Sequence, residues 1–227
     1  MTSVDSTAWE ALVKRLEALK SFRLHTGNMN DYLQLKTKRY KTSAEELVAY
    51  EYSTSEIESA IDATLDQLKV ENIEQLIVDF PHPEDDEVDQ NWLNKVLAIW
   101  KDLEKLVQSG KLVSIGVSDF NLKALQMLVD AAEVKPCVNH YNIDGCCVVP
   151  PDLQKYAQEN DIQLLTHNDP HPFPLREVFQ TICTLNKSAP VCRERFVPTW
   201  AARYTVWIRR RSIMAAKGYI VQFDSTS

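Results

Sequence analysis

Residues 111–120, KLVSIGVSDF, constrain the fold of this chain more than any other segment. Apolar and β-branched residues fill most of the segment, polar residues close it, and a helical pattern follows at once. This composition is typical of a buried parallel strand whose carboxyl end delivers polar groups to one rim of a sheet. In a βα barrel that rim carries the active site, so we expect Ser118 and Asp119 to occupy a functional position.

Strand and helix patterns alternate along most of the chain. Strands are predicted at 23–29, 47–52, 73–80, 112–118, 137–143 and 162–167, and apolar residues at helical spacing lie between most of them. A helix that begins at Thr7 and another at 175–185 are also predicted. This alternation indicates parallel βαβ units. Two later strands, 203–208 and 218–223, are expected to form a hairpin across Arg209 to Arg211.

The length of the chain sets a limit on this fold. It has 227 residues, which suit one α/β domain, but a complete eight-unit barrel takes about 250 residues. No linker rich in proline or glycine divides the sequence. We therefore predict a single domain over residues 1–227 with a (β/α)8 TIM-barrel-like fold that is incomplete or remodelled near both termini.

Composition excludes several classes of function. A formal net charge of -7 argues against nucleic acid or an anionic membrane as the main partner, since both favour a basic surface. Five irregularly spaced cysteines argue against a disulfide scaffold or a zinc site and favour reduced thiols in the cytoplasm. No signal peptide is expected, and no apolar run approaches the ~20 residues of a membrane span.

Sequence motifs exclude other chemistries. None of the five glycines lies in a Gly-x-Gly or Gly-Lys-Ser context, so no phosphate-binding loop of the Rossmann or P-loop type is predicted. A Gly-x-Ser-x-Gly nucleophile elbow is also missing. The acidic run at 84–87 lacks the spacing and the glycine of an EF-hand, and we interpret it as a solvated loop.

Polar residues close each predicted parallel strand, and the barrel topology would bring them to one rim. A cluster of histidines and carboxylates of this kind could be an acid/base or metal site. Alternatively, these residues are the ordinary polar starts of loops and the caps of helices. The absence of a His-x-x-x-His pair favours this second interpretation. The rim residues are Asp79, His82, Ser118, Asp119, His140, Tyr141, Asn142, His167, Asn168 and Asp169.

Over residues 47–170 the chain resembles the aldo-keto reductases, whose fifth strand usually ends in Ile-Gly-Val-Ser-Asn-Phe. The resemblance implies their fold, but their functional residues do not carry over. Asp79 stands at the position of the catalytic histidine, and Asp119, His140 and His167 replace the Asn, Gln and Tyr that contact the nicotinamide. No Asp-x-x-x-x-Tyr element is visible, and residues 47–52 contain no lysine. The resemblance therefore implies no catalytic residue and no cofactor, with degenerate cofactor positions at Ser118, Asp119, His140 and His167.

A more specific resemblance covers residues 22–222. The strings FRLHTGN at 22–28, CCVVPPDL at 146–153 and DIQLLTHNDP at 161–170 are similar to the regulatory (modifier) subunits of glutamate-cysteine ligase, a non-reductase branch of the same fold. This resemblance implies a non-catalytic protein that binds the ligase's catalytic subunit, raises its affinity for glutamate and weakens feedback inhibition by glutathione. The alternatives are an NADP-dependent aldo-keto reductase-like oxidoreductase and a scaffold for another protein.

Three places are candidates for contact with a partner. They are the loop with Cys146 and Cys147, the rim at His167, Asn168 and Asp169, and the segment with Arg203 and Tyr204. Adjacent residues in an extended chain point to opposite sides, so burial of one thiol of the Cys146–Cys147 pair tends to expose the other. An exposed thiol could form a reversible disulfide with the catalytic subunit. The alternative is that both cysteines are inert, buried and small.

Overall fold

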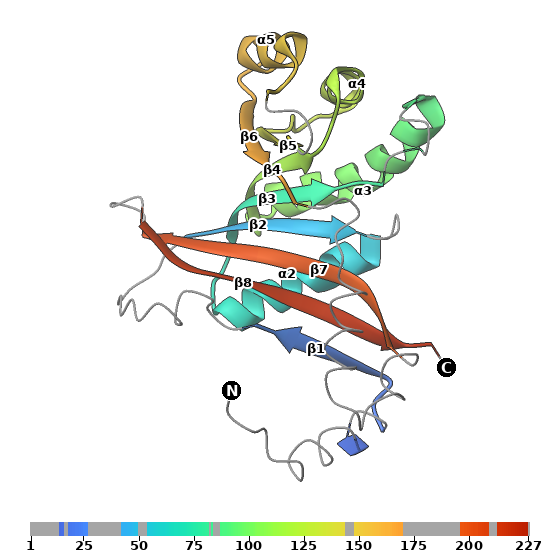
Figure 1. Cartoon of the computed structure of the whole chain (residues 1–227), viewed down its shortest axis with the longest axis vertical. Helices are drawn as coiled ribbons and strands as arrows, with labels where there is room; N and C mark the ends of the chain where they lie inside the picture. The colour runs from blue at the N-terminus through green and yellow to red at the C-terminus, as the bar shows by residue number, and fades with distance from the viewer. Residues whose placement is uncertain are drawn as a thin grey trace.

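The computed structural model describes residues 14–15, 18–26, 42–49, 54–81, 83, 87–143, 148–169, 196–208 and 213–226. These residues form an eight-stranded sheet in the order β1-β8-β7-β2-β3-β4-β5-β6, shown in Figure 1. The strands are β1 (Ser21–His25), β2 (Thr42–Ala49), β3 (Ile73–Asp79), β4 (Leu112–Ser118), β5 (Val138–Asn142), β6 (Gln163–His167), β7 (Phe196–Ile208) and β8 (Ile213–Ser225). The helices are α2 (Thr54–Leu68), α3 (Gln90–Gln108), α4 (Leu122–Ala131) and α5 (Pro151–Glu159).

Strands β2 to β6 form the parallel half of the sheet, and a helix connects each strand to the next. This arrangement confirms the predicted βαβ units. Neighbouring strands of this parallel half pair over different lengths. Strands β3 and β4 pair from Ile73 to Asp79, whereas β4 and β5 share only the pairs Val117–Asn139 and Ser118–His140. The edge unit β5–α5–β6 is therefore joined to the rest of the sheet by a short ladder.

A glycine explains how β4 and β5 approach each other where they meet. A Cβ atom at Gly116 would collide with the side chain and the carbonyl oxygen of Val138. Only glycine removes that collision, so this position is fixed by the contact between the two strands.

The remaining strands are antiparallel and remodel both ends of the predicted barrel. Strands β7 and β8 form a long hairpin, as the sequence predicts, and β7 pairs antiparallel with β2. Strand β1 pairs with β8 at the outer edge. Among the described residues the sheet is open, which confirms a barrel-like fold that is incomplete near its termini.

Four strands differ by several residues from their predicted bounds. The hairpin strands predicted at 203–208 and 218–223 are longer, at Phe196–Ile208 and Ile213–Ser225. The strand predicted at 47–52 lies at Thr42–Ala49, because the ladder to β3 already includes the register pairs of Glu45 and Glu46. Because this strand contains charged residues, a search for apolar runs does not find its start. The strand predicted at 23–29 lies at Ser21–His25. Thr7 and the helix predicted at 175–185 lie outside the described residues.

Helix α3 shows how the parallel half is stabilised. Its N-cap residue Asp89 accepts a hydrogen bond from the Trp92 amide at 2.7 Å, which satisfies one of the free amides at a helix start. Trp100 is fully buried, and its indole N–H donates to the Val134 carbonyl at 2.8 Å. Buried Glu104 accepts from the amides of Glu133 and Val134, at 2.9 Å each. In the described part of the chain, no helix is both long and apolar enough to cross a membrane.

Candidate functional site

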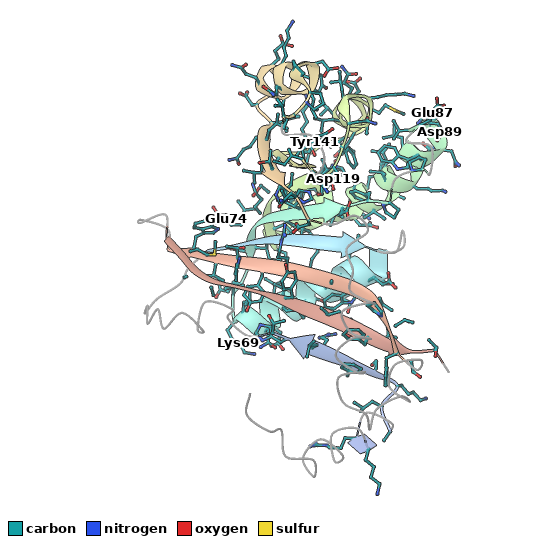
Figure 2. The ribbon with its side chains drawn as sticks, in the orientation of Figure 1. Lys69, Glu74, Glu87, Asp89, Asp119 and Tyr141 are labelled. Atoms are coloured by element: carbon teal, nitrogen blue, oxygen red, sulfur yellow. The ribbon has the colours of Figure 1, made fainter. Side chains whose placement is uncertain are left out.

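The carboxyl ends of four parallel strands meet at one place, and the side chains that follow them come together there. Asp79 ends β3, Asp119 follows β4, His140 lies on β5, and His167 ends β6. Figure 2 shows Asp119 and Tyr141 in this region, between α5 and β2 in the view drawn. The parallel topology thus brings together residues that lie up to 88 positions apart, from Asp79 to His167.

Asp119 holds the end of β4 to the end of β5. Its φ angle is +59°, in the left-handed region that non-glycine residues rarely adopt but that aspartate tolerates best. Its amide donates to the His140 carbonyl at 3.0 Å, and its Oδ1 accepts from the Asn142 amide at 2.6 Å. These bonds compensate for the backbone strain and fix the direction of the carboxylate.

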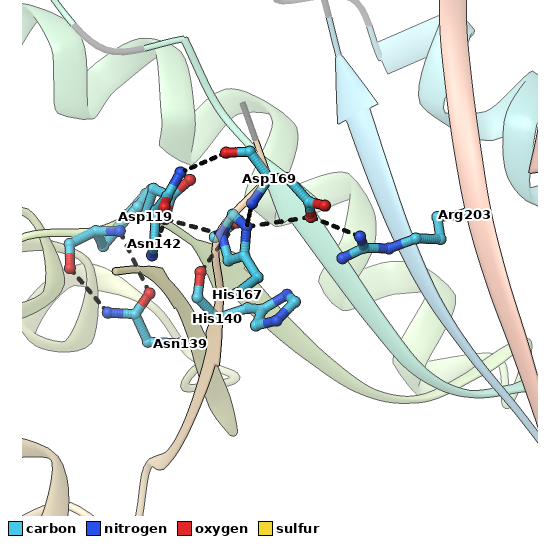
Figure 3. A network of polar contacts seen from close by, with 9 residues as sticks. Asp119, Asn139, His140, Asn142, His167, Asp169 and Arg203 are labelled. Carbon is cyan, nitrogen blue, oxygen red and sulfur yellow. Dashed lines mark hydrogen bonds and ion pairs between the residues drawn. The ribbon is translucent and has the colours of Figure 1, made fainter. Parts of the chain in front are cut away.

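A chain of polar contacts runs from Asp119 to the hairpin, as Figure 3 shows. The His167 Nε2 atom lies 3.1 Å from Asp119 Oδ1, and its Nδ1 atom lies 3.2 Å from Asp169 Oδ2. Arg203 on β7 donates from Nη1 to the same Asp169 Oδ2 at 2.6 Å. The Asn142 side-chain amide donates to the Asp169 carbonyl at 2.9 Å. His167 is the central link, because it contacts both carboxylates.

The surroundings of the two histidines act on them in opposite directions. Burial alone would lower the pKa of His167, but its hydrogen bond to Asp119 and the negative charges of Asp119, Asp169 and Asp79 outweigh burial and raise the pKa. Burial lowers the pKa of His140, and the charge of His167 adds to this effect. The rings of His140 and His167 lie 4.4 Å apart between centroids. The site thus favours one positive imidazolium, on His167, over two.

Asp79 is the least satisfied carboxylate of the site. The residue as a whole retains some exposure, but its Oδ1 atom is enclosed and has no hydrogen-bond partner. The pKa of Asp79 is raised to about 7, first by burial and then by the charge of Asp119, while His167 acts in the opposite direction. A carboxyl group with this pKa binds and releases a proton near neutral pH.

Two polar residues beneath the site act as structural supports. Ser118 is 1% exposed, and its hydroxyl donates to the His140 carbonyl at 3.0 Å. Asn139 is fully buried, accepts from the Phe120 amide at 3.3 Å and donates to the Phe120 carbonyl at 2.8 Å. Both residues hold β5 against the segment that follows β4.

The partner-contact candidates lie in different settings. Asn168 is exposed, whereas the side chains of Asp169 and Arg203 are partly exposed and paired with each other. Tyr204 is 2% exposed, and its hydroxyl lies 3.0 Å from His25 Nε2 on β1. Cys146, Cys147 and His82 lie outside the described residues.

Sequence reasoning named the rim residues but missed how they pair. Asp169 and Arg203 were both candidates, yet nothing in the sequence links two residues of opposite charge that lie 34 positions apart. The buried support Asn139 was also missed. Its one signal is a polar residue between Val138 and His140 within a predicted buried strand.

The arrangement is suited to binding protons and holding strand ends together. Within the described ranges, no group of three or more His, Cys, Asp or Glu side chains is placed to bind a metal ion. A nicotinamide carboxamide needs both a donor and an acceptor from the protein. Here Asp119 and His167 are bonded to each other, and Asp119 also accepts from the Asn142 amide.

Three comparisons place the chain among known proteins. The model of the aldo/keto reductase family matches residues 11–168. The glutamate–cysteine ligase regulatory subunit of Homo sapiens is 40% identical over 183 residues, which cover 80% of this chain and 65% of that protein. The putative glutamate–cysteine ligase regulatory subunit of Schizosaccharomyces pombe is 32% identical over 137 residues, or 60% of this chain and 46% of that protein. The match to the human subunit thus spans less than two thirds of its length.

Reductases are also similar to this chain, over shorter stretches. An NADPH-dependent alpha-keto amide reductase of Saccharomyces cerevisiae is 28% identical over 116 residues, or 51% of this chain and 37% of that protein. A solved aldo-keto reductase from a deep-sea metagenome library has a TM-score of 0.43 and 23% identity, and the match covers 52% of this chain and 41% of that one.

Proposed function

This chain belongs to the aldo/keto reductase family, and from that premise we propose that it is a non-catalytic regulatory subunit that binds the catalytic subunit of a glutamate–cysteine ligase. Its similarity to curated regulatory subunits over 80% of its length supports this proposal. The identity of 40% to the human subunit exceeds the 28% to the yeast reductase, and it extends over a longer match.

One observation carries the non-catalytic role: the side chains at the rim bond to one another and to the chain's own backbone. Asp119, which stands where the reductases have an amide, bonds to His167 and to the Asn142 backbone. The Oδ1 atom of Asp79, the residue at the position of the catalytic histidine, is enclosed. A general acid contributes roughly 10²- to 10⁴-fold to a reaction rate, so its replacement removes much of a reductase's activity. We propose that no nicotinamide binds here.

A regulatory subunit acts by favouring one conformation of the subunit it binds. We propose that this chain raises the affinity of the catalytic subunit for glutamate and weakens feedback inhibition by glutathione. A coupling free energy of about 1–3 kcal/mol would suffice, which corresponds to roughly 5- to 150-fold in affinity. We also propose that the protein works in the cytoplasm, without a cofactor and without nucleic acid or membrane as a partner.

The docking surface is proposed from exposure and charge. Asn168 is exposed at the rim beside His167 and Asp169, and the side chain of Arg203 is 27% exposed. Tyr204 is enclosed, so its proposed contribution is to hold β7 against β1 through His25. Cys146 and Cys147 remain candidates for a redox-sensitive link to the partner.

The kinetic effect on the catalytic subunit tests this function. We expect addition of this chain to the purified catalytic subunit to lower the apparent KM for glutamate several-fold and to change kcat only modestly. Identical kinetics at saturating concentrations of both proteins would exclude the regulatory role. Titration with NADPH separates the reductase alternative, since a binding signal or turnover of a generic aldehyde would contradict the non-catalytic proposal.

The cysteine candidates need a separate experiment. Non-reducing electrophoresis of the oxidised complex would compare the wild type with Cys146→Ser and Cys147→Ser, with Cys192→Ser as the control. The redox role predicts a heavier covalent species that Cys192→Ser retains and that one variant of the pair loses. If no such species forms, the pair has no role of this kind.

A further inference from the structure

The chain Asp119–His167–Asp169–Arg203 joins two parts of the molecule that are far apart in the order of the strands. Strand β6 ends the sheet on one side, and four strands lie between it and β7. The Arg203–Asp169 contact at 2.6 Å nevertheless connects them directly. Strand β6 pairs with β5, and β5 in turn pairs with β4 at only two register positions. This contact across the open sheet therefore supports the most weakly attached unit of the parallel half.

The geometry at His167 accommodates two hydrogen-bond patterns. In one pattern both ring nitrogens are protonated and donate to carboxylates, from Nε2 to Asp119 at 3.1 Å and from Nδ1 to Asp169 at 3.2 Å. In the other pattern Nδ1 is unprotonated and accepts from the Asp169 amide at 3.4 Å. The first pattern binds two carboxylates with charge-assisted bonds, which are stronger than the long neutral bond of the second.

Charge balance also favours the protonated pattern. The charged groups that face His167 are Asp119 and Asp169, with Asp79 and His140 beside them and Arg203 beyond Asp169. With His167 protonated and Asp79 neutral, the two cations balance the two remaining carboxylates. Loss of the His167 proton leaves one uncompensated negative charge in a partly buried place, and ionisation of Asp79 does the same. A further charged residue, Glu46 of β2, pairs with Arg203 in the register of β2 and β7.

We propose that Asp119, His167, Asp169 and Arg203 form a proton-operated latch that fastens the edge unit β5–α5–β6 to the hairpin β7–β8. The latch is closed when His167 is protonated, because only then do both of its ring nitrogens donate. Loss of the proton releases the carboxylate of Asp169 on the His167 side and leaves Arg203 as its only charged partner in the latch. The edge unit then opens more often, since its remaining attachment to β4 is the short ladder and the hydrogen bonds around the ends of the two strands.

Hydrogen exchange combined with histidine NMR tests the latch in the wild-type chain. Ring signals of His167 give its pKa, and amide exchange in β5 and β6, divided by the intrinsic rate at each pH, gives the protection factors. The expected result is a fall in protection that begins as pH passes the pKa of His167 in the open state and is complete once pH exceeds the pKa that NMR measures in the closed state. The fall amounts to about tenfold for each unit by which the pKa of His167 in the closed state exceeds that in the open state. Protection factors that do not change across the titration would overturn the proposal.

Two variants separate a latch from a merely structural contact. His167→Gln keeps a hydrogen-bonding side chain but cannot titrate, so its β6 protection is expected to be low and to lose the part of the pH dependence that belongs to His167, while the part that belongs to Asp79 remains. The matched control is His25→Gln, which removes another histidine in contact with the hairpin, at Tyr204, and is expected to keep the pH dependence. If His167→Gln keeps the wild-type pH dependence, or His25→Gln loses it, the assignment to His167 is wrong.

A charge rescue at the other end of the latch completes the test. Arg203→Gln removes the cation that shares Asp169 with His167, and it is expected to raise the pKa of His167 while lowering β6 protection at low pH. Arg203→Lys keeps the charge and is expected to restore part of the protection. This pKa readout remains valid if either variant is less stable, because it is measured on the folded molecule. An unchanged pKa of His167 in Arg203→Gln would contradict the coupling.

Discussion

The parallel half and the antiparallel strands β1, β7 and β8 are stabilised in different ways. Most of the buried apolar residues form one large cluster, to which helices α2 to α5 contribute. The antiparallel strands add a second, smaller cluster of Phe196, Ala201, Val221 and Phe223, against which Phe22 and Tyr219 pack. Phe22 lies 4.9 Å from both Phe196 and Phe223, edge-on to the first and stacked on the second. The hairpin contributes residues such as Trp200 and Tyr204 to the large cluster and adds local aromatic contacts of its own, whereas the parallel half depends on its layered helices.

The largest expected effect comes from the core of the parallel half. Trp100→Ala leaves a cavity beside β4, and it also leaves the Val134 carbonyl without its hydrogen-bond donor. The free energy of unfolding should therefore fall by about 3–5 kcal/mol. Urea denaturation followed by circular dichroism would measure it. A loss below about 1 kcal/mol would show that the helices contribute less than their burial indicates.

The next effect concerns the contact between β4 and β5. Gly116→Ala places a methyl group against the side chain and the carbonyl oxygen of Val138. This overpacking is expected to lower the free energy of unfolding by about 1–3 kcal/mol. The Val138→Ala companion variant relieves only the side-chain part of the clash. A double variant as stable as Val138→Ala alone would show that the backbone contact is unimportant.

A smaller effect depends on pH and involves Asp79. Its folded pKa of about 7 lies above the ordinary value of 3.8, so the folded state binds the proton more tightly and stability falls as pH rises between these values. The raised pKa of His167 acts in the same direction, since its contribution is lost as pH rises through its folded value. Asp79→Asn should therefore raise Tm at pH 8.5 by roughly 4 °C and leave Tm near pH 4 almost unchanged. An equal rise at both pH values would point to packing instead of charge.

The smallest effect tests the aromatic cluster of the hairpin. Phe196→Leu keeps an apolar side chain but removes the edge-on contact with Phe22, and a loss of about 1 kcal/mol is expected. Thermal unfolding of the variant, with the exposed Val113→Ala as the control, would measure the difference. A loss equal to that of Trp100→Ala would show that the small cluster contributes as much to stability as the large one.

The same contrast determines what could be predicted from the sequence. The strand at 112–118 was predicted with its observed bounds, Leu112–Ser118, because a buried parallel strand is apolar on both faces. The hairpin was also predicted from its apolar runs. The second neighbour of β7 could not be predicted, because its pairing with β2 joins residues about 155 positions apart, such as Leu47 and Ala202. The same holds for the Asp169–Arg203 contact, which depends on that tertiary arrangement.

The strand order also governs the sequence of events when the chain is synthesised. Strands β1 and β2 are made early, but β8 and β7 lie between them in the sheet, and β1 pairs only with β8 among the described strands. Among the described strands, β1 therefore has no neighbour in a growing chain until residues 220–224 have been added. Sheets closed by pairings this distant in sequence fold slowly and leave strand edges exposed meanwhile. The edge of β1 therefore stays exposed for most of the time that the described part of the chain takes to be made.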